Sequence, residues 1–184
     1  MVTNTDATIE DLYNAPDDGK YELVDGRLIH ISPTGFRPVR IAGRIFDALY
    51  DYEEATGGGM AIGDNLGFIV RQPRLRSFSP DAAYIAGTLE ETDDFVEGAP
   101  IFAVEVRSKG DHGPANDAAY AAKRADYFAA GTQVVWDVNP RTQTVARYRA
   151  DAPDAPRLFT SGEIADAEPA LPDWRMAVRD IFRS

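Results

Sequence analysis

The stretch 101-IFAVEVRSKGD-111 decides the fold, because it combines an apolar run with a carboxylate in its middle. Apart from Glu105, residues 101–106 are all apolar, which predicts a strand buried on both faces of a sheet. A buried ionised carboxylate destabilises the fold by several kcal/mol unless it is paired or ligates a metal. Arg107 lies on the same strand face and is one candidate partner. The simplest interpretation is a structural ion pair at the solvated end of the strand.

The segments that follow this strand predict an α/β fold. An Ala-rich helix is expected over residues 114–130, with Pro114 in its first turn and Gly131 after its end. The apolar segment 133-QVVWDVNP-140 then reads as another buried strand. A helix between two such strands predicts a right-handed crossover between parallel neighbours. We therefore expect a mixed α/β or α+β fold, with a central mixed sheet flanked by helices.

The remaining segments fit one domain over residues 1–184, with residues 1–16 as an N-terminal helical segment and no separate linker. Thr8 and Asp11 form a capping-box pattern for a short first helix, and Asp25-Gly26 is typical of a hairpin turn. The other expected elements are a helix over 39–55, strands within 57–70 and 79–87, an exposed acidic connection over 88–100, a strand over 143–150 that pairs with 133–140, and a short helix within 174–182.

Composition limits the functional classes. The chain of 184 residues has a formal net charge of −11, no cysteine and only two histidines, which excludes a disulfide framework, a thiolate zinc site and a His-rich metal site. The polar N-terminus and the short apolar runs predict a cytoplasmic protein without a membrane span. The acidic balance argues against tight, non-specific binding of nucleic acid. It does not exclude a metal site, since carboxylates that hold an ion bring negative charge with them.

Asp81 is the second candidate site residue. It opens the strand segment 81-DAAYIA-86 and precedes Glu105 by one strand and one loop, so adjacent strands can place the two carboxylates side by side. Two carboxylates with water suit a hard cation such as Mg²⁺. Alternatively, Asp81 is only a turn residue after Pro80. Glu22, in 21-YELVDGRL-28, is either a third acid of the site or the exposed side of a strand.

Lys123 lies on the predicted crossover helix, where its long side chain can reach back over the strand ends. With Tyr127 it forms an i,i+4 pair on one helix face. The alternative is an ordinary solvated lysine. The side of the helix that packs on the sheet is expected to consist of Ala122, Ala125, Phe128 and Ala129.

Several blocks together resemble a known family. The blocks are YELVDGRL, SPDAAYIA, FAVEVRS and KRADYFAAGTQVVWDVNP, followed by a late LPDW. In this order they resemble the Uma-type restriction endonuclease family, a branch of the PD-(D/E)xK nuclease superfamily, from about residue 9 to the C-terminus. Each block alone is unspecific, whereas their order over most of the chain is specific.

The resemblance implies a restriction endonuclease-like core and a Mg²⁺- or Mn²⁺-dependent hydrolysis of phosphodiester bonds in DNA. Asp81 and Glu105 would ligate the ion, with the carbonyl of Val106 as a further ligand. Lys123 would replace the motif lysine of the superfamily, whose position is occupied here by Arg107, and Glu22 matches an early acidic position. In this role Arg107 would contact the substrate phosphate. By analogy with enzymes that cut both strands, we expect a homodimer that binds DNA weakly or transiently.

Two departures keep alternatives open. Arg107 stands where the family has more often an apolar residue, and Ser108–Asp111 reads SKGD where the family usually has SP. The first alternative is an inactive binding or assembly module in which the acids form a structural ion pair. The second is a metal-dependent hydrolase of a smaller anionic substrate. The position of the arginines at 37–44 and 71–76 relative to the acid pair discriminates between DNA and a small substrate.

Overall fold

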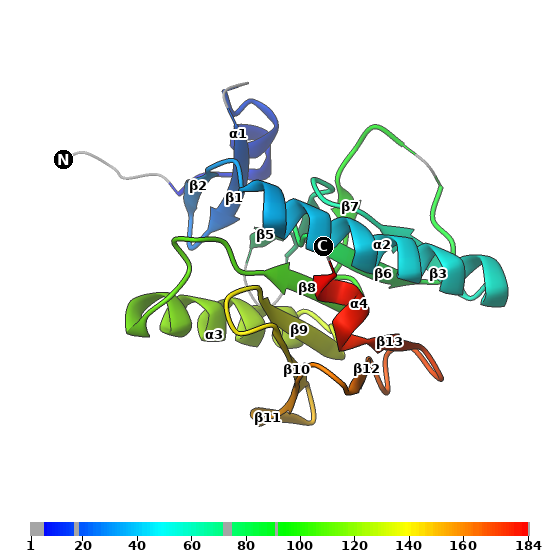
Figure 1. Ribbon diagram of the computed structural model, residues 1–184. Helices are drawn as coiled ribbons and strands as arrows, with labels where there is room; N and C mark the ends of the chain where they lie inside the picture. Colours follow the sequence, from blue (N-terminus) through cyan, green and yellow to red (C-terminus); the bar gives the residue numbers. More distant parts are fainter. Residues whose placement is uncertain (1–5, 17–18, 72–74, 91, 184) are drawn as a thin grey trace.

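The computed structural model describes residues 6–16, 19–71, 75–90 and 92–183. Its centre is a six-stranded mixed sheet in the order β11-β10-β9-β8-β6-β3, flanked by helices as predicted (Figure 1). The two long helices are α2 (Phe36–Thr56) and α3 (Pro114–Ala129). The strands of this sheet are β3 (Gly59–Ile62), β6 (Ala82–Ala86), β8 (Phe102–Val106), β9 (Val134–Asn139), β10 (Thr144–Arg149) and β11 (Ala152–Phe159). None of the helices in the described part of the chain is long and apolar enough to cross a lipid bilayer.

The predicted crossover between two parallel neighbouring strands is confirmed. β8 and β9 pair in parallel, with Glu105 opposite Asp137, and α3 connects them. β6 pairs with the other edge of β8 in antiparallel orientation, and β10 pairs antiparallel with β9. All five residues of β8 are buried, so this strand lies in the middle of the sheet as the apolar run predicts.

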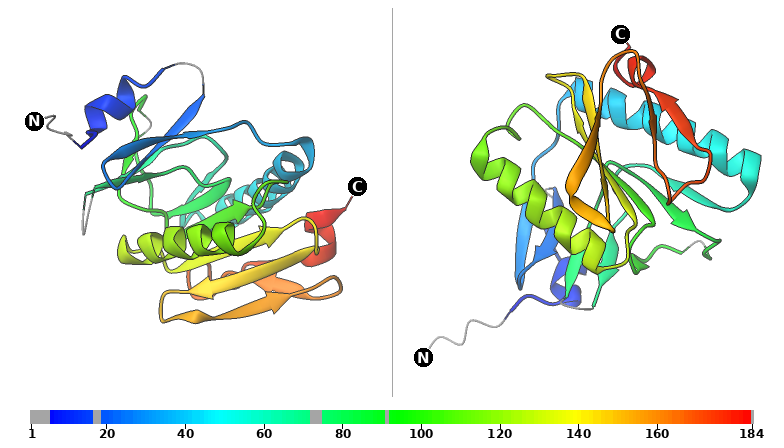
Figure 2. Two further views of the ribbon diagram at one scale, coloured as in Figure 1. Left: turned by 90° about the vertical axis from the view of Figure 1, so that its left-hand side faces the viewer. Right: turned by 90° about the horizontal axis from the view of Figure 1, so that it is seen from below.

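The side chains of β8 alternate between two hydrophobic clusters. Phe102 and Val104 pack in the cluster formed with α2 and the C-terminal residues. Ala103 packs in the other cluster, which includes Tyr127 of α3. Figure 2 shows α2 and α3 on opposite sides of the sheet. Because strand residues alternate, Glu105 faces α3.

The predicted N-terminal hairpin is present as β1 (Lys20–Val24) and β2 (Arg27–Ile31). Asp25 and Gly26 both have positive φ, 48° and 69°, which is the backbone of a type I′ turn. The Leu23 N–H donates to Ser77 Oγ at 2.7 Å, which ties β1 to β5 (Arg76–Phe78). This attachment positions Glu22, whose side chain is buried. The capping box of Thr8 and Asp11 is also confirmed, at the start of α1 (Ile9–Tyr13).

Several short strands were not predicted. The segment 57–70 divides into β3 and β4 (Phe68–Val70), which belong to different sheets. β4 lies between β5 and β7 (Val96–Glu97), so the acidic connection is not a plain exposed loop. β7 depends on parallel pairing with β4, a long-range contact that no local pattern reveals. Near the C-terminus, β12 (Ile164–Asp166) pairs with β13 (Arg175–Ala177), and the expected short helix is α4 (Val178–Phe182).

The predicted orientation of the Ala-rich helix is wrong in one respect. Tyr127 is completely buried, whereas Ala122, Ala125 and Ala129 are exposed. Of the residues expected to pack on the sheet, Phe128 does so. The physical reason is that the buried Glu105 carboxylate requires hydrogen-bond donors. Tyr127 supplies one, whereas a helix face of alanines has none.

Candidate active site

Asp81 and Glu105 lie next to each other across two antiparallel strands. Ala82 pairs with Val104, so Asp81 stands opposite Glu105 when the register is continued by one residue. The Asp81 N–H donates to the Val104 carbonyl at 3.0 Å, and Asp81 Oδ2 accepts from the Val106 N–H at 2.6 Å. Residues in direct opposition have Cβ atoms about 4.5–5.5 Å apart. The structure therefore brings the two predicted carboxylates together on the α3 side of the sheet.

Lys123 reaches this carboxylate pair from α3. Its Nζ lies 2.9 Å from Glu105 Oε1 and 3.0 Å from Glu22 Oε1. The Tyr127 hydroxyl donates to Glu105 Oε1 at 2.7 Å, and the Ser79 N–H donates to Glu22 Oε1 at 3.1 Å. Lys123 is thus not a solvated helix lysine, and Glu22 is not on an exposed strand face. Tyr127 was not predicted to touch the site, although its i,i+4 spacing from Lys123 was a usable signal.

These side chains open into a cavity of about 490 Å³, which we call the acid cavity. The hairpin, the start of β6, the end of β8 and one face of α3 surround it. Its lining includes the following residues: Lys20, Glu22, His30, Arg76, Ser79, Asp81, Glu105, Val106, Ser108, Asp111, Tyr120 and Lys123. Four of the five predicted catalytic residues line this cavity, and Arg107 does not.

The charges in the acid cavity are unbalanced toward the negative side. Burial, followed by repulsion from Glu105, raises the pKa of Asp81 to about 7. Burial also raises the pKa of Glu105, although Lys123 opposes this shift. For Lys123, burial lowers the pKa, but the charges of Glu105 and Glu22 outweigh burial and raise it above its ordinary value. Lys123 is therefore a stable ammonium, and Asp81 lacks a full counter-charge.

The raised pKa of Asp81 predicts a pH-dependent stability of the metal-free protein. The ordinary pKa is 3.8 and the folded value is about 7, so the folded state retains a proton that the unfolded state releases between these values. The free energy of unfolding therefore falls as pH rises from about 4 to 7. Asp81→Asn removes this dependence and should be the more stable protein at pH 8 in EDTA, by at most about 4 kcal/mol.

Urea unfolding of the wild type and Asp81→Asn at pH 4, 6 and 8 measures the difference between their free energies of unfolding. It should be close to zero at pH 4 and largest at pH 8. Equal stability at pH 8 would show that Asp81 carries no electrostatic strain. Millimolar Mn²⁺ at pH 8 should stabilise the wild type more than Asp81→Asn, because only the wild type has both carboxylates.

The Arg107 side chain forms ion pairs and hydrogen bonds with residues other than Glu105. Its guanidinium forms a two-pronged ion pair with Asp137, with Nε–Oδ1 and Nη2–Oδ2 distances of 2.7 Å each. It also binds Asp117 and donates to the Asp111 carbonyl at 3.1 Å. The proposed pairing of Arg107 with Glu105 is therefore not what the structure shows. The role predicted for Arg107 at the substrate phosphate stays a prediction, and its geometry is that of a structural residue.

Arg107→Met should destabilise the protein by about 3 kcal/mol, because it leaves the buried Asp137 with Arg124 as its remaining cationic partner at 3.4 Å. Affinity for Mn²⁺ should stay within about threefold of the wild-type value, since Arg107 does not line the acid cavity. Urea unfolding and isothermal titration measure the two effects. A loss of Mn²⁺ binding without a loss of stability would instead place Arg107 in the metal site.

Of the arginines at 37–44 and 71–76 that the structure describes, only Arg76 lines the acid cavity. Arg76 lines it but pairs with Asp126, and Arg71 pairs with the exposed Glu97. Arg44 donates to the Ile181 carbonyl at 3.2 Å, on the α4 side of α2. Arg74 lies outside the described residues. Arg37 lines a neighbouring cavity.

The residues present fit a magnesium-type ion rather than a metal held by protein ligands alone. Within the described ranges, no group of three or more His, Cys, Asp or Glu side chains is arranged to hold a metal. Mg²⁺ is usually bound by one or two carboxylates, with water and substrate phosphate as its other ligands. The hydrogen bond to Asp81 uses Oδ2, and those to Glu105 use Oε1. One oxygen of each carboxylate thus has no hydrogen-bond donor in the described part of the structure.

A mixed sheet with two acids on neighbouring strands and a lysine above them defines a restriction endonuclease-like protein. The chain belongs to the Uma2 family, described as "Putative restriction endonuclease", whose model matches residues 7–179. The fold is similar to the crystal structure of a protein from Anabaena variabilis, described as a putative nuclease belonging to DUF820. The TM-score is 0.73 at 17% sequence identity, over 95% of this chain and 97% of that chain. The comparison with curated proteins gave no match.

Proposed function

We propose that the protein is a Mg²⁺- or Mn²⁺-dependent nuclease that hydrolyses phosphodiester bonds in DNA. The observation that carries this proposal is the convergence of Asp81, Glu105 and Lys123 in one cavity. They come from two strands and a crossover helix, and are up to 42 positions apart in the sequence. Membership in the Uma2 family supports the reaction class.

Asp81, Glu105 and the Val106 carbonyl are the groups that would hold the ion. A divalent ion supplies charge neutralisation at a phosphate oxygen and lowers the pKa of a bound water. Asp81 is held toward this position by the hydrogen bond from the Val106 N–H, and Glu105 by the Tyr127 hydroxyl. The protein therefore fixes both carboxylates before substrate binds.

Lys123 acts as a fixed hydrogen-bond donor rather than as a base. Its raised pKa keeps it protonated at neutral pH, so it has no free lone pair to accept a proton. An ammonium beside the reacting phosphate stabilises the negative charge that develops on the oxygens. Glu22 orients Lys123 through the 3.0 Å contact and completes the constellation.

DNA is the proposed substrate, and its binding should be weak and salt-dependent because the protein carries a net charge of −11. A homodimer remains our proposal, since two copies related by a two-fold axis present two sites to the two strands of a duplex.

The direct test is nicking of supercoiled plasmid by the wild-type protein in Mg²⁺ or Mn²⁺. We expect conversion to the open-circular form that EDTA abolishes. Absence of cleavage in millimolar Mn²⁺, together with absence of Mn²⁺ binding by titration, would favour the inactive module, in which Lys123 serves only as the ion-pair partner of Glu105.

A smaller anionic substrate is the second candidate, since the volume of the acid cavity, about 490 Å³, lies in the range of small-ligand sites. Hydrolysis of a dinucleotide or an aryl phosphodiester without cleavage of plasmid would favour this candidate over DNA.

A further inference from the structure

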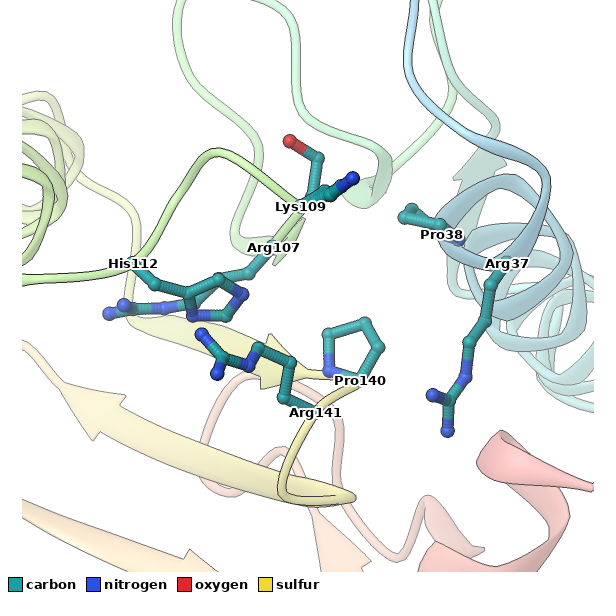
Figure 3. Close-up of a pocket in the computed structure, with 8 residues that line it drawn as sticks. Arg37, Pro38, Arg107, Lys109, His112, Pro140 and Arg141 are labelled. Carbon is teal, nitrogen blue, oxygen red and sulfur yellow. The ribbon is translucent and has the colours of Figure 1, made fainter.

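A second cavity lies beside the acid cavity and has the opposite charge. It has a volume of about 490 Å³, and Ser108 lines both cavities. We call it the basic cavity, and its lining is Arg37, Pro38, Arg107, Ser108, Lys109, His112, Pro140 and Arg141. Figure 3 shows Arg107, His112 and Arg141 gathered on one side of it and Arg37 on the other.

Three segments far apart in the sequence build the basic cavity. Arg37 comes from the first turn of α2, and Lys109 from the connection between β8 and α3. Arg141 comes from the turn between β9 and β10. That turn is held by Asn139, whose Oδ1 accepts from the N–H groups of Arg141 at 3.0 Å and Thr142 at 3.4 Å. The Asn139 side chain therefore holds the turn that carries Arg141.

Three of the four Arg and Lys side chains in this cavity have no acidic partner among the described residues. In the parts of the chain that the structure describes, no carboxylate lies within ion-pair distance of Arg37, Lys109 or Arg141. Arg107 differs, because Asp137 and Asp117 neutralise it. The protein has 30 acidic and 19 basic residues, so three exposed cations left together without an acid are contrary to its overall balance.

The start of α2 also has features of an anion-binding site. Helix N-termini favour acidic residues, since the backbone N–H groups there carry partial positive charge. The first turn of α2 has no acid, its N-cap Gly35 makes no side-chain cap, and Arg37 adds a further positive charge. This arrangement is unfavourable in isolation and becomes favourable when an anion binds at the helix end.

We propose that the basic cavity binds phosphate groups of the DNA strand next to the phosphate that occupies the acid cavity. This inference rests on the proposed function. The two cavities meet at Ser108, so one strand can place successive phosphates in both. The arginine guanidinium groups suit phosphate because their planar forks can donate to two oxygens at once. Binding of the DNA strand is thereby concentrated on one face of a protein whose net charge is negative.

The test is the affinity for a fluorescent duplex of about 20 base pairs, measured by anisotropy in EDTA, where the proposed cleavage cannot occur. The variants are Arg37→Gln, Lys109→Gln and Arg141→Gln, each with one charge removed. The matched control is Arg157→Gln, since Arg157 is exposed on β11 and lines neither the acid cavity nor the basic cavity. Thermal melting shows that each variant remains folded.

Each cavity variant should bind about tenfold more weakly than the wild type at 50 mM salt, and the slope of log K against log salt should fall by about 0.9. Arg157→Gln should keep the wild-type slope. The inference is overturned if the cavity variants behave like the control, or if the wild type does not bind the duplex.

Plasmid nicking in Mg²⁺, measured in parallel, separates the two proposals. Nicking by the wild type with unchanged duplex affinity in the variants contradicts only the basic-cavity proposal. Affinity that depends on Arg37, Lys109 and Arg141 without any nicking contradicts the nuclease and retains the phosphate-binding surface.

Discussion

Glu105→Gln is expected to lower metal-dependent nicking by at least about 100-fold, because it removes a charged ligand while it preserves the shape of the side chain. In the wild type, the Tyr127 hydroxyl donates to Glu105 Oε1 at 2.7 Å, and the amide oxygen of the variant can still accept this hydrogen bond. The protein should therefore remain folded, with an unchanged circular dichroism spectrum. Plasmid nicking over a range of Mg²⁺ concentrations measures the effect.

The matched control is Glu97→Gln, an identical change of an exposed glutamate that pairs with Arg71 away from the acid cavity. It should nick plasmid at the wild-type rate. Wild-type nicking by Glu105→Gln would remove the carboxylate pair from the mechanism.

Lys123→Met has the largest expected effect on stability. It leaves Glu22 and Glu105, both buried, without their shared ammonium. We expect a loss of about 3 kcal/mol in the free energy of unfolding at pH 8, and a loss of nicking of about 100-fold. The pKa of Glu105 is already raised by burial and should rise further in the variant, so the destabilisation should shrink as pH falls and the carboxyl takes up a proton.

A second variant separates stability from catalysis. Lys123→Met combined with Glu22→Gln removes one of the two buried carboxylates that lack a counter-charge, and it should recover much of the lost stability. It should not recover nicking, since the donor to the phosphate is still missing. Full stability of Lys123→Met alone at pH 8 would contradict the ion-pair geometry.

Local patterns predicted the crossover and the hairpin beside the acid cavity, but not β5, whose Arg76 also lines this cavity. The apolar runs around Glu105 and before Asn139, with a capped helix between them, predict the β8-α3-β9 crossover. The one strand and one loop between Asp81 and Glu105 predict their juxtaposition. The structure pairs β6 with β8 in antiparallel orientation and β8 with β9 in parallel, in agreement with both expectations.

Tertiary pairing determined what the sequence left open. The short strands β5 and β7 are stable only through their contacts with β4, and no periodic pattern marks a strand of two or three residues. The buried Glu105 determines which face of α3 packs against the sheet, because its carboxylate requires the Tyr127 hydroxyl and the Lys123 ammonium.

The sequence contains a signal for the partner of Arg107. Asp137 interrupts the apolar strand 134–138 in the same way that Glu105 interrupts 102–106. The two carboxylates are neighbours in the β8–β9 register, and each needs its own cation. Glu105 takes Lys123, and Asp137 takes Arg107. The single domain, the cytoplasmic location and the homodimer stay predictions.

The most direct test of the central claim is a crystal of the protein soaked in millimolar Mn²⁺ and measured for anomalous scattering. We predict one peak between Asp81 and Glu105, within roughly 2.0–2.6 Å of an oxygen of each carboxylate. Well-ordered carboxylates with no peak between them, or a peak that contacts only one of them, would contradict the account.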